Sequence, residues 1–250
     1  MKLEVLTYNI HKGFCTGNWR FVLDEIREQI KASNADLVFL QEIYGNRSPH
    51  KKRKIDLPEE PHFEYLAEQI WPHFIYGKNA IYRRGDHGNA ILSKYPFCEW
   101  ENISLTRNPR ASRSILHGVI ELEGNTRLHT LCVHMGLLQR EREQHVKKLV
   151  ERIRQHVPDN EPMIIAGDFN DWRSRINGDL EQDLGARELF HFLRGRYQKT
   201  FPIWKPMLPV DRIYYRGLEA ITCETHADGH WLDLSDHVAL GGSFELVKSV

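Results

Sequence analysis

Residues 162–170 read PMIIAGDFN, a short apolar run followed at once by an acidic and an amide side chain. The run is typical of a buried strand, because it is short, apolar and bounded by proline and glycine. Asp168 and Asn170 are two positions apart, so in an extended chain their side chains point the same way. Taken alone, such a pair more often opens a turn after a strand than builds a site. Whether Asp168 and Asn170 belong to a turn or to a functional site therefore depends on the rest of the chain.

The hydrophobic pattern on either side of this stretch predicts many strands and a few helices. Strands are expected at residues 2–10, 35–42, 89–93, 97–104, 115–122, 128–134, 162–168, 211–217, 218–224 and 237–246. Helices are expected at residues 19–33, with Asn18 as the N-cap, and at 62–71, 138–157 and 185–194. Loops are expected at residues 45–61, 105–113, 171–184 and 201–210.

The order of these elements indicates the fold class. Residues 88–134 hold consecutive strands with no helix between them. Parallel neighbours need a crossover connection, so this run argues against a doubly wound parallel sheet. We predict one mixed α/β domain over residues 1–250, with largely antiparallel sheets and helices on the outside.

Composition excludes several classes of protein. The chain has 250 residues, 41% of them hydrophobic, and 34 basic residues balance 34 acidic ones. These values exclude a disordered chain, and the balance argues against a protein that holds long duplex DNA by phosphate neutralisation. A basic segment at residues 47–54 keeps nucleic acid open as a substrate. No C-x-x-C pair, leader-like segment or long apolar run is present, so we expect reduced thiols and a cytoplasmic protein.

Polar side chains recur at the ends of the predicted strands. They are Asn9, His11, Glu42, His134, Asp168, Asn170, Asp211, Asp236 and His237. Each has a structural explanation when taken alone, as the polar end of a strand or a satisfied histidine. Strand ends are also where loops gather and sites form, and the same residue types recur there. Together they indicate one functional site.

The residue types in this set suit a hard divalent cation. Glu42, Asp168 and Asp236 offer the carboxylate oxygens that Mg²⁺ and Mn²⁺ prefer. Zinc would favour more histidine or cysteine ligands. His134 and His237 would then do acid–base work or stabilise developing negative charge. Phosphoester hydrolysis is the reaction that most needs this combination.

The motifs also resemble a known family. In chain order they are TYNIHKG (7–13), LQE (40–42), GNAILSKYP (88–96), VHMG (133–136), GDFN (167–170), VDRIYY (210–215) and SDH (235–237). This ordered set resembles the endonuclease/exonuclease/phosphatase (DNase I-like) superfamily over nearly the whole chain. It is most similar to a bacterial branch of small, stand-alone metal-dependent hydrolases.

The resemblance implies an α/β fold, a four-layer α/β/β/α sandwich of two packed, mixed and mainly antiparallel sheets. It also implies roles for the polar residues. Glu42 would be the main ligand of Mg²⁺ or Mn²⁺, with Asn9 beside it and Asp236 within reach. The resemblance implies that Asp168 orients or deprotonates the attacking water, and that Asn170 and His134 contact the phosphate. It also implies that His237 holds the scissile phosphate and that Asp211 orients the ring of His237.

Three further residues are predicted to contact substrate. Asn89 would sit close to the site, and Arg113 would bind phosphate through its guanidinium. His11 takes the place where nuclease members usually carry Asp or Asn, and an imidazole supports a second hard cation less well. Trp172, Trp204 and Trp231 lie in or near loops, where one could stack on a base or sugar, although a core position is commoner.

We therefore expect a metal-dependent phosphodiesterase whose substrate is a nucleic acid, a nucleotide, or a phosphorylated lipid or sugar. A sphingomyelinase-like lipid-headgroup phosphodiesterase and an inositol-phosphate phosphatase are the enzymatic alternatives. A catalytically silent binding protein with this fold is the alternative from another class. We expect a monomer that has neither a membrane span nor an obligate protein partner.

Overall fold

The computed structural model describes residues 1–47, 60–68, 70–82, 85–105 and 113–246. Its strands form two six-stranded sheets that mix parallel and antiparallel pairs. The first sheet has the order β11 (Leu218–His226), β12 (Ala239–Leu246), β1 (Lys2–Asn9), β2 (Leu37–Arg47), β4 (Gly85–Ser93) and β3 (His73–Tyr82). The second has the order β5 (Phe97–Ser104), β6 (Ser114–Leu122), β7 (Thr126–His134), β8 (Met163–Asp168), β10 (Asp211–Arg216) and β9 (Arg187–Glu188).

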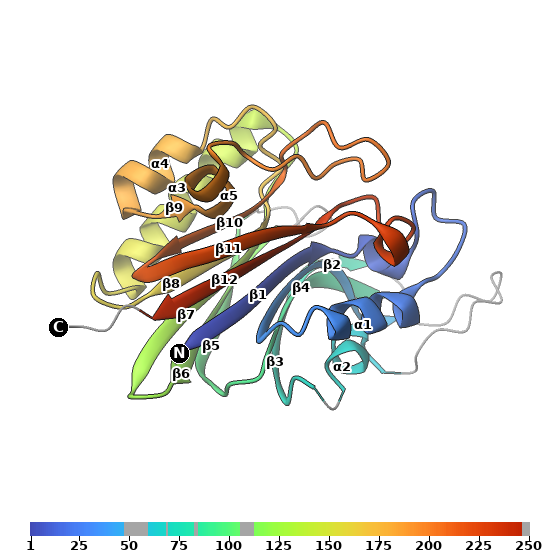
Figure 1. The fold of residues 1–250 in the computed structure, drawn as a ribbon, viewed down its shortest axis with the longest axis horizontal. Helices are drawn as coiled ribbons and strands as arrows, with labels where there is room; N and C mark the ends of the chain where they lie inside the picture. Colours follow the sequence, from blue (N-terminus) through green and yellow to red (C-terminus); the bar gives the residue numbers. More distant parts are fainter. Residues whose placement is uncertain (48–59, 69, 83–84, 106–112, 247–250) are drawn as a thin grey trace.

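Helices cover the outer faces of the paired sheets (Figure 1). The first sheet carries α1 (Leu23–Ala32) and α2 (His62–Ala67), with the short turns η1 (His11–Gly13) and η2 (Gly229–Trp231) nearby. The second sheet carries α3 (Gln139–His156) and α4 (Asn177–Leu184), and α5 (Leu189–Arg194) follows β9. This order of layers confirms the predicted four-layer α/β/β/α sandwich.

Alternation along the central strands explains their continuous apolar runs. In β2, Leu37 and Phe39 belong to the core between the sheets, whereas Val38 and Leu40 pack under α1 and α2. In β8, Ile164 likewise belongs to the core between the sheets, whereas the other face of the strand packs under α3. Because both faces of each strand are buried, the sequence shows no alternation of apolar and polar residues there.

The strand register brings the polar strand ends together. Parallel pairing of β7 with β8 sets His134 opposite Asp168, and antiparallel pairing of β10 with β8 sets Asp211 opposite the same residue. In the other sheet, parallel pairing of β1 with β2 sets Asn9 opposite Gln41, next to Glu42. The carboxyl ends of both parallel pairs therefore carry the candidate site.

Several predicted elements differ from the structure. The first helix begins at Leu23 with Val22 as the N-cap, so the prediction of Asn18 as its cap is wrong. Asn18 instead has a left-handed φ of 60°. Two elements were missed: β3, and α4, which lies within the segment expected to be a loop. The helix expected at residues 185–194 is β9 followed by α5.

Two further points concern the limits of the described chain. The basic segment at residues 47–54 lies outside the described residues, apart from the backbone of Arg47 at the end of β2. Within the described ranges, none of the helices is both long and apolar enough to cross a bilayer.

Candidate active site

The polar strand ends line one cavity of about 230 Å³. Its lining residues are Asn9, Glu42, Arg113, His134, Leu137, Asp168, Asn170, Trp172, Phe201, Leu208, Val210 and His237. They come from both sheets and from the loops after β7 and β8 and before β10. Seven of the predicted site residues therefore line one cavity, and its five other lining residues form an apolar wall.

Asp168 lies at the centre of the polar surface and is buried. Its Oδ2 accepts a hydrogen bond from Nδ2 of Asn9 at 3.2 Å, and Nε2 of His134 lies 3.4 Å from the same oxygen. Its Oδ1 accepts from the backbone N–H of Asn170 at 2.9 Å. Burial, and then the negative charge of Asp211, raise the pKa of Asp168 to about 7. A carboxyl group with this pKa exchanges a proton readily near neutral pH.

His237 forms the second feature of the site, through its contact with Asp211. Its Nδ1 lies 2.8 Å from Oδ2 of Asp211, and its backbone N–H donates to Oγ of Ser235 at 3.3 Å. Burial alone would lower the pKa of His237. The carboxylates of Asp211, Asp168 and Asp236 outweigh burial and raise it to about 10, so the ring is an imidazolium at neutral pH.

His134 has the opposite protonation state. Nη1 of Arg113 lies 3.3 Å from its Nδ1, and a guanidinium can only donate, so Nδ1 accepts and Nε2 carries the proton. Burial, and then the charge of Arg113, lower the pKa of His134 well below its usual value. His134 is thus a neutral N–H donor whose Nε2 faces Asp168.

Glu42 faces a lysine that the sequence analysis did not single out. Nζ of Lys12 lies 2.7 Å from Oε2 of Glu42. Both residues have left-handed backbones, with φ of 61° at Lys12 and 55° at Glu42, and such conformations gather at functional sites. Burial would raise the pKa of Glu42, but the positive charge beside it, including the ammonium of Lys12, outweighs burial and lowers the pKa to about 2.

Four predicted residues do not line the cavity: Asp211, which lies behind His237, and His11, Asp236 and Asn89. Nδ1 of His11 lies 3.3 Å from Oδ1 of Asp236, so these two residues contact each other beside the site. Asn89 is fully buried, and its Nδ2 donates to the backbone oxygens of Ser114 at 3.3 Å and Cys132 at 3.4 Å. Its amide joins β4 of one sheet to β6 and β7 of the other.

The donor set of the site fits a hard divalent cation. Asp168 and Asp211 place carboxylate oxygens within 4.8 Å of each other, and a ring nitrogen of His237 lies within the same distance of both. Oδ1 of Asp211 is buried without a hydrogen-bond partner among the described residues. Among the described residues, the predicted ligands Glu42 and Asp236 do not belong to this group. Most donors are carboxylate oxygens, which suits Mg²⁺ or Mn²⁺ better than zinc.

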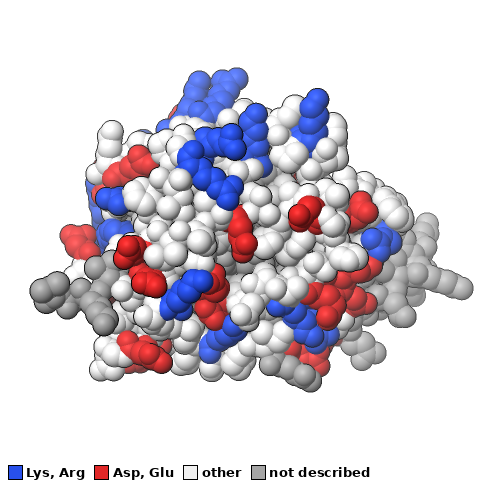
Figure 2. Space-filling view, viewed as in Figure 1, with Lys and Arg blue, Asp and Glu red and all other residues white. Residues whose placement is uncertain are grey.

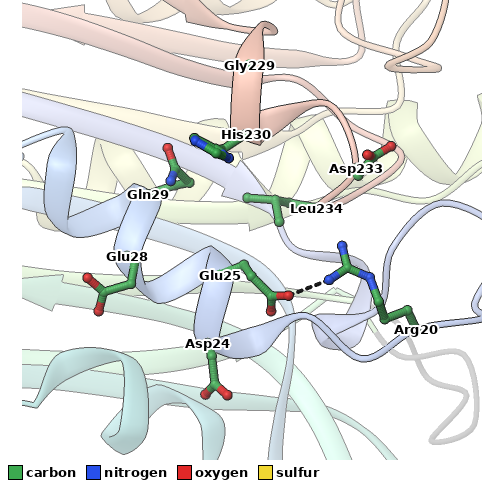
Figure 3. A pocket seen from close by; sticks show the side chains of 9 residues that line it. All are labelled: Arg20, Asp24, Glu25, Glu28, Gln29, Gly229, His230, Asp233 and Leu234. Atoms are coloured by element: carbon green, nitrogen blue, oxygen red, sulfur yellow. Dashed lines mark hydrogen bonds and ion pairs between the residues drawn. The ribbon is translucent and has the colours of Figure 1, made fainter.

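A second cavity, of about 460 Å³, lies between α1 and η2 (Figure 3). Its walls carry carboxylates of α1, and Arg20 forms an ion pair with Glu25 at its rim. It is larger than the strand-end cavity, but it contains none of the predicted site residues. Size alone therefore does not identify the site.

The apolar wall of the site comes from loops, and Trp172 is the one of its residues that the sequence analysis named. Trp172, which is 37% exposed, lies with its ring 4.5 Å from the guanidinium carbon of Arg142. Trp204 is 68% exposed, whereas Trp231 is buried in the core. Of the three tryptophans, only Trp231 therefore occupies the core position that is commoner for this residue type. The position of Trp172 two residues after Asn170 is the one sequence signal that could have pointed to this wall.

Comparison with known proteins agrees with the observed fold and with the resemblance of the motifs. The model of the Endonuclease/Exonuclease/phosphatase family matches residues 6–237. The uncharacterized protein YbhP of Escherichia coli (strain K12) is 38% identical over 244 residues, which cover 97% of this chain and 96% of YbhP.

Solved structures share the fold at low sequence identity. An endonuclease/exonuclease/phosphatase from Bacteroides vulgatus superposes with a TM-score of 0.78 at 18% identity, covering 99% of this chain and 100% of that one. TDP2 of D. rerio, solved with a single-strand DNA product, has a TM-score of 0.68 at 18% identity, covering 98% and 99%. At this identity the likeness shows the fold alone.

Proposed function

Because the chain belongs to the endonuclease/exonuclease/phosphatase family, we propose that it is a divalent-metal-dependent phosphodiesterase. One observation carries the proposal. Asp168, with a pKa near 7, shares a cavity with a neutral histidine donor, His134, and with the imidazolium of His237. A base, a neutral donor and a fixed cation around one space are what hydrolysis of a phosphoester requires.

In this proposal Asp168 acts on the attacking water. Asn9 and the backbone of Asn170 hold the two carboxylate oxygens, so the side chain has one orientation. A carboxyl group with a pKa of about 7 can accept a proton from water near neutral pH, because its basicity matches that pH. Asp168 would thus orient the water and take its proton as the water oxygen bonds to phosphorus. The bond from phosphorus to the leaving oxygen would break in the same step, and the departing alkoxide would take a proton from solvent.

The histidines would stabilise the phosphate. His237 would place its Nε2 and its positive charge beside the scissile phosphate, because Asp211 occupies its Nδ1. His134 would donate its Nε2 proton to a phosphate oxygen, and the side chain of Asn170 would donate to another. Arg113 supports this arrangement because it fixes the tautomer of His134. Hydrogen bonds and charge placed in advance around developing negative charge are the largest catalytic contribution in many enzymes.

Mg²⁺ or Mn²⁺ would neutralise the phosphate when bound. Glu42 would be its main protein ligand, since the pKa of about 2 keeps this carboxylate ionised at any physiological pH. Asn9 would hold the same ion, and Asp236 would lie within its reach. His11 contacts Asp236 and would face the substrate from the edge of the site.

For the substrate, we propose several classes of phosphodiester rather than one compound. A nucleic acid, a nucleotide, or a phosphorylated lipid or sugar could each present a phosphodiester to this cavity. Support for a silent binding protein is weak, because Asp168, Asp211 and His237 are all present and in contact distance. We also propose that the protein works as a monomer in the cytoplasm, which its free cysteines suit.

A metal-supplemented substrate panel tests the proposal. The purified protein would be given bis-p-nitrophenyl phosphate, p-nitrophenyl phosphate, single- and double-stranded oligonucleotides, sphingomyelin and inositol phosphates side by side. We expect hydrolysis of at least one diester, faster than that of the monoester, and no hydrolysis by Asp168→Asn. Equal rates for the wild type and this variant on every compound would overturn the proposal.

A further inference from the structure

Large apolar side chains are exposed around the mouth of the candidate active site. Leu137 and Leu138 are 59% and 65% exposed, and Trp204 and Met207 are 68% and 49% exposed. Leu137 lines the cavity, and so do Phe201 and Leu208 of the loop that carries Trp204 and Met207. Single exposed apolar residues are ordinary, but several on two loops of one cavity mark an interaction surface.

The fold holds these side chains out rather than leaving them on free loops. Phe201 and Leu208 exchange backbone hydrogen bonds at 3.1 and 2.9 Å, so the segment between them is a closed loop that carries Trp204. On the other loop, Nη1 of Arg142 donates to the backbone oxygens of Gly136 and Leu137. Figure 1 shows the loop before β10 extending beyond the ends of the strands. Ordered backbones therefore present the apolar side chains.

The same loops are basic, although the chain as a whole is neutral. Segments 135–142, 171–176 and 199–210 contain six basic residues (Arg140, Arg142, Arg173, Arg175, Lys199 and Lys205) and two acidic ones (Glu141 and Asp171). Asp171, which lies beside Arg212, and Arg142 are both buried, so neither adds charge to the surface. Five exposed basic residues and one exposed acidic residue remain. Figure 2 shows basic side chains gathered along the upper part of the molecule, the side on which Figure 1 places these loops.

We propose that these loops form a docking surface for an anionic lipid bilayer. The mouth surface comprises Leu137, Leu138, Trp204 and Met207 together with the exposed basic residues Arg140, Arg173, Arg175 and Lys205. Apolar side chains that enter the interface and basic ones that face anionic headgroups are how peripheral proteins hold to membranes. This inference rests on the proposed function, because the docked cavity would take a phosphodiester presented at that bilayer.

A nucleic acid fits the mouth surface less well. Single strands are held by aromatic rings on which bases stack, together with basic residues that follow the backbone. Trp204 could supply such a ring, and so could Trp172 and Phe201 of the cavity wall. The other large apolar side chains of the mouth surface, Leu137, Leu138 and Met207, are aliphatic and offer no flat face to a base. Aliphatic side chains lose their contact with water by entering the acyl region of a bilayer. The composition of the surface therefore favours lipid.

Vesicle sedimentation tests the inference without using catalysis. The protein, in EDTA, would be mixed with vesicles of phosphatidylcholine alone or of phosphatidylcholine with phosphatidylglycerol. The test variant is Leu138→Ser/Trp204→Ser/Met207→Ser, since none of these residues lines the cavity. Leu138 is the N-cap of α3, a position where serine is favoured, so the helix should persist. Trp100→Ser, at a 55% exposed tryptophan on β5, is the matched control.

We expect the wild type and Trp100→Ser to sediment with the anionic vesicles, and salt to weaken this binding. Each large apolar side chain removed should weaken binding roughly tenfold, so the single variant Trp204→Ser already reports the effect if the triple variant folds poorly. Equal binding by the triple variant and the wild type, or no binding by the wild type, would overturn the inference. Binding to a single-stranded oligonucleotide that the triple variant loses, with no vesicle binding, would overturn it in favour of nucleic acid.

The experiment distinguishes a failure of the proposed phosphodiesterase activity from a failure of the proposed docking surface. Hydrolysis of soluble bis-p-nitrophenyl phosphate should be the same for the wild type and the triple variant, because the cavity is unchanged. A wild type that binds anionic vesicles but hydrolyses no phosphoester would contradict only the proposed function. A wild type that hydrolyses the soluble diester but ignores vesicles would contradict only the docking surface.

Discussion

Nδ1 of His237 lies 2.8 Å from Oδ2 of Asp211, although 26 residues separate them in the chain. Asp211 is held at this place because β10 begins there, opposite Asp168 in β8. Ser235 fixes the other partner, since its Oγ donates to the backbone oxygen of Asn9 and accepts from the N–H of His237. The contact therefore ties the two sheets together and leaves Nε2 of His237 to the cavity.

Replacing His237 should slow catalysis more than it weakens binding. We expect His237→Ala to lower kcat on the order of 100-fold or more, because it removes a cation that acts on developing charge. Asp211→Asn should lower kcat less, because the ring remains. If the pair only joined two strands, both variants would lose stability and keep the specific activity of the folded fraction. Measuring kcat and Tm on the same samples separates the two outcomes.

The pH dependence of kcat should be bell-shaped. Asp168 must lose its proton to act as a base, so kcat rises as the pH passes about 7. His237 must keep its proton, so kcat falls as the pH passes about 10. In Asp211→Asn the burial of His237 is no longer outweighed by this carboxylate, so the alkaline limb should move to lower pH. If the alkaline limb lies at the same pH in Asp211→Asn as in the wild type, then the titration of His237 does not cause that limb.

Glu42→Gln should bind metal poorly and keep its fold. The substitution preserves shape and removes the charge that attracts the cation, and losses of this kind cost roughly 10–100-fold in affinity or activity. Calorimetric titration with Mn²⁺ measures the affinity directly, and Glu219→Gln, an exposed change on β11, is the control. Normal Mn²⁺ binding by Glu42→Gln would mean that another residue is the main ligand.

Gly167→Ala should destabilise the fold strongly. Gly167 has a φ of +143°, and an added Cβ would lie 2.1 Å from the backbone oxygen of Val133 in β7. Strain and overpacking of this kind each cost about 1–3 kcal/mol, so urea unfolding should show a loss of roughly 2–6 kcal/mol. Gly178→Ala, in a helix with open space around it, should instead be neutral or stabilising. Similar stability for the two variants would contradict the close approach of β7 and β8.

Much of the site could be predicted because strand pairing places it. Asn9, His134 and Asp168 each end a strand, and parallel pairing brings such ends to one edge of a sheet. The pattern also predicts most strands, since continuous apolar runs mark those buried on both faces. The resemblance of the motifs adds the pairing of Asp211 with His237, which no local pattern shows.

Other features depend on contacts that a local pattern does not encode. The ion pair of Lys12 with Glu42 joins two residues that have left-handed backbones, and no local pattern in the sequence marks either of them. The helix α4 has only Leu180 and Leu184 as apolar residues and includes Gly178, so its helical pattern in the sequence is weak. Its two leucines pack with the apolar residues of α3, and this tertiary contact stabilises the helix. The apolar mouth of the cavity arises from loops, whose positions relative to one another follow only from the fold.

The most direct test of the account is a metal titration of phosphodiester hydrolysis. Protein treated exhaustively with EDTA would be assayed on bis-p-nitrophenyl phosphate as Mg²⁺ or Mn²⁺ is added, with Asp168→Asn prepared in parallel. We predict no hydrolysis after chelation, saturable recovery with either ion in the wild type, and no recovery in Asp168→Asn. Full activity after chelation, or equal recovery in the variant, would contradict a metal-dependent phosphodiesterase centred on Asp168.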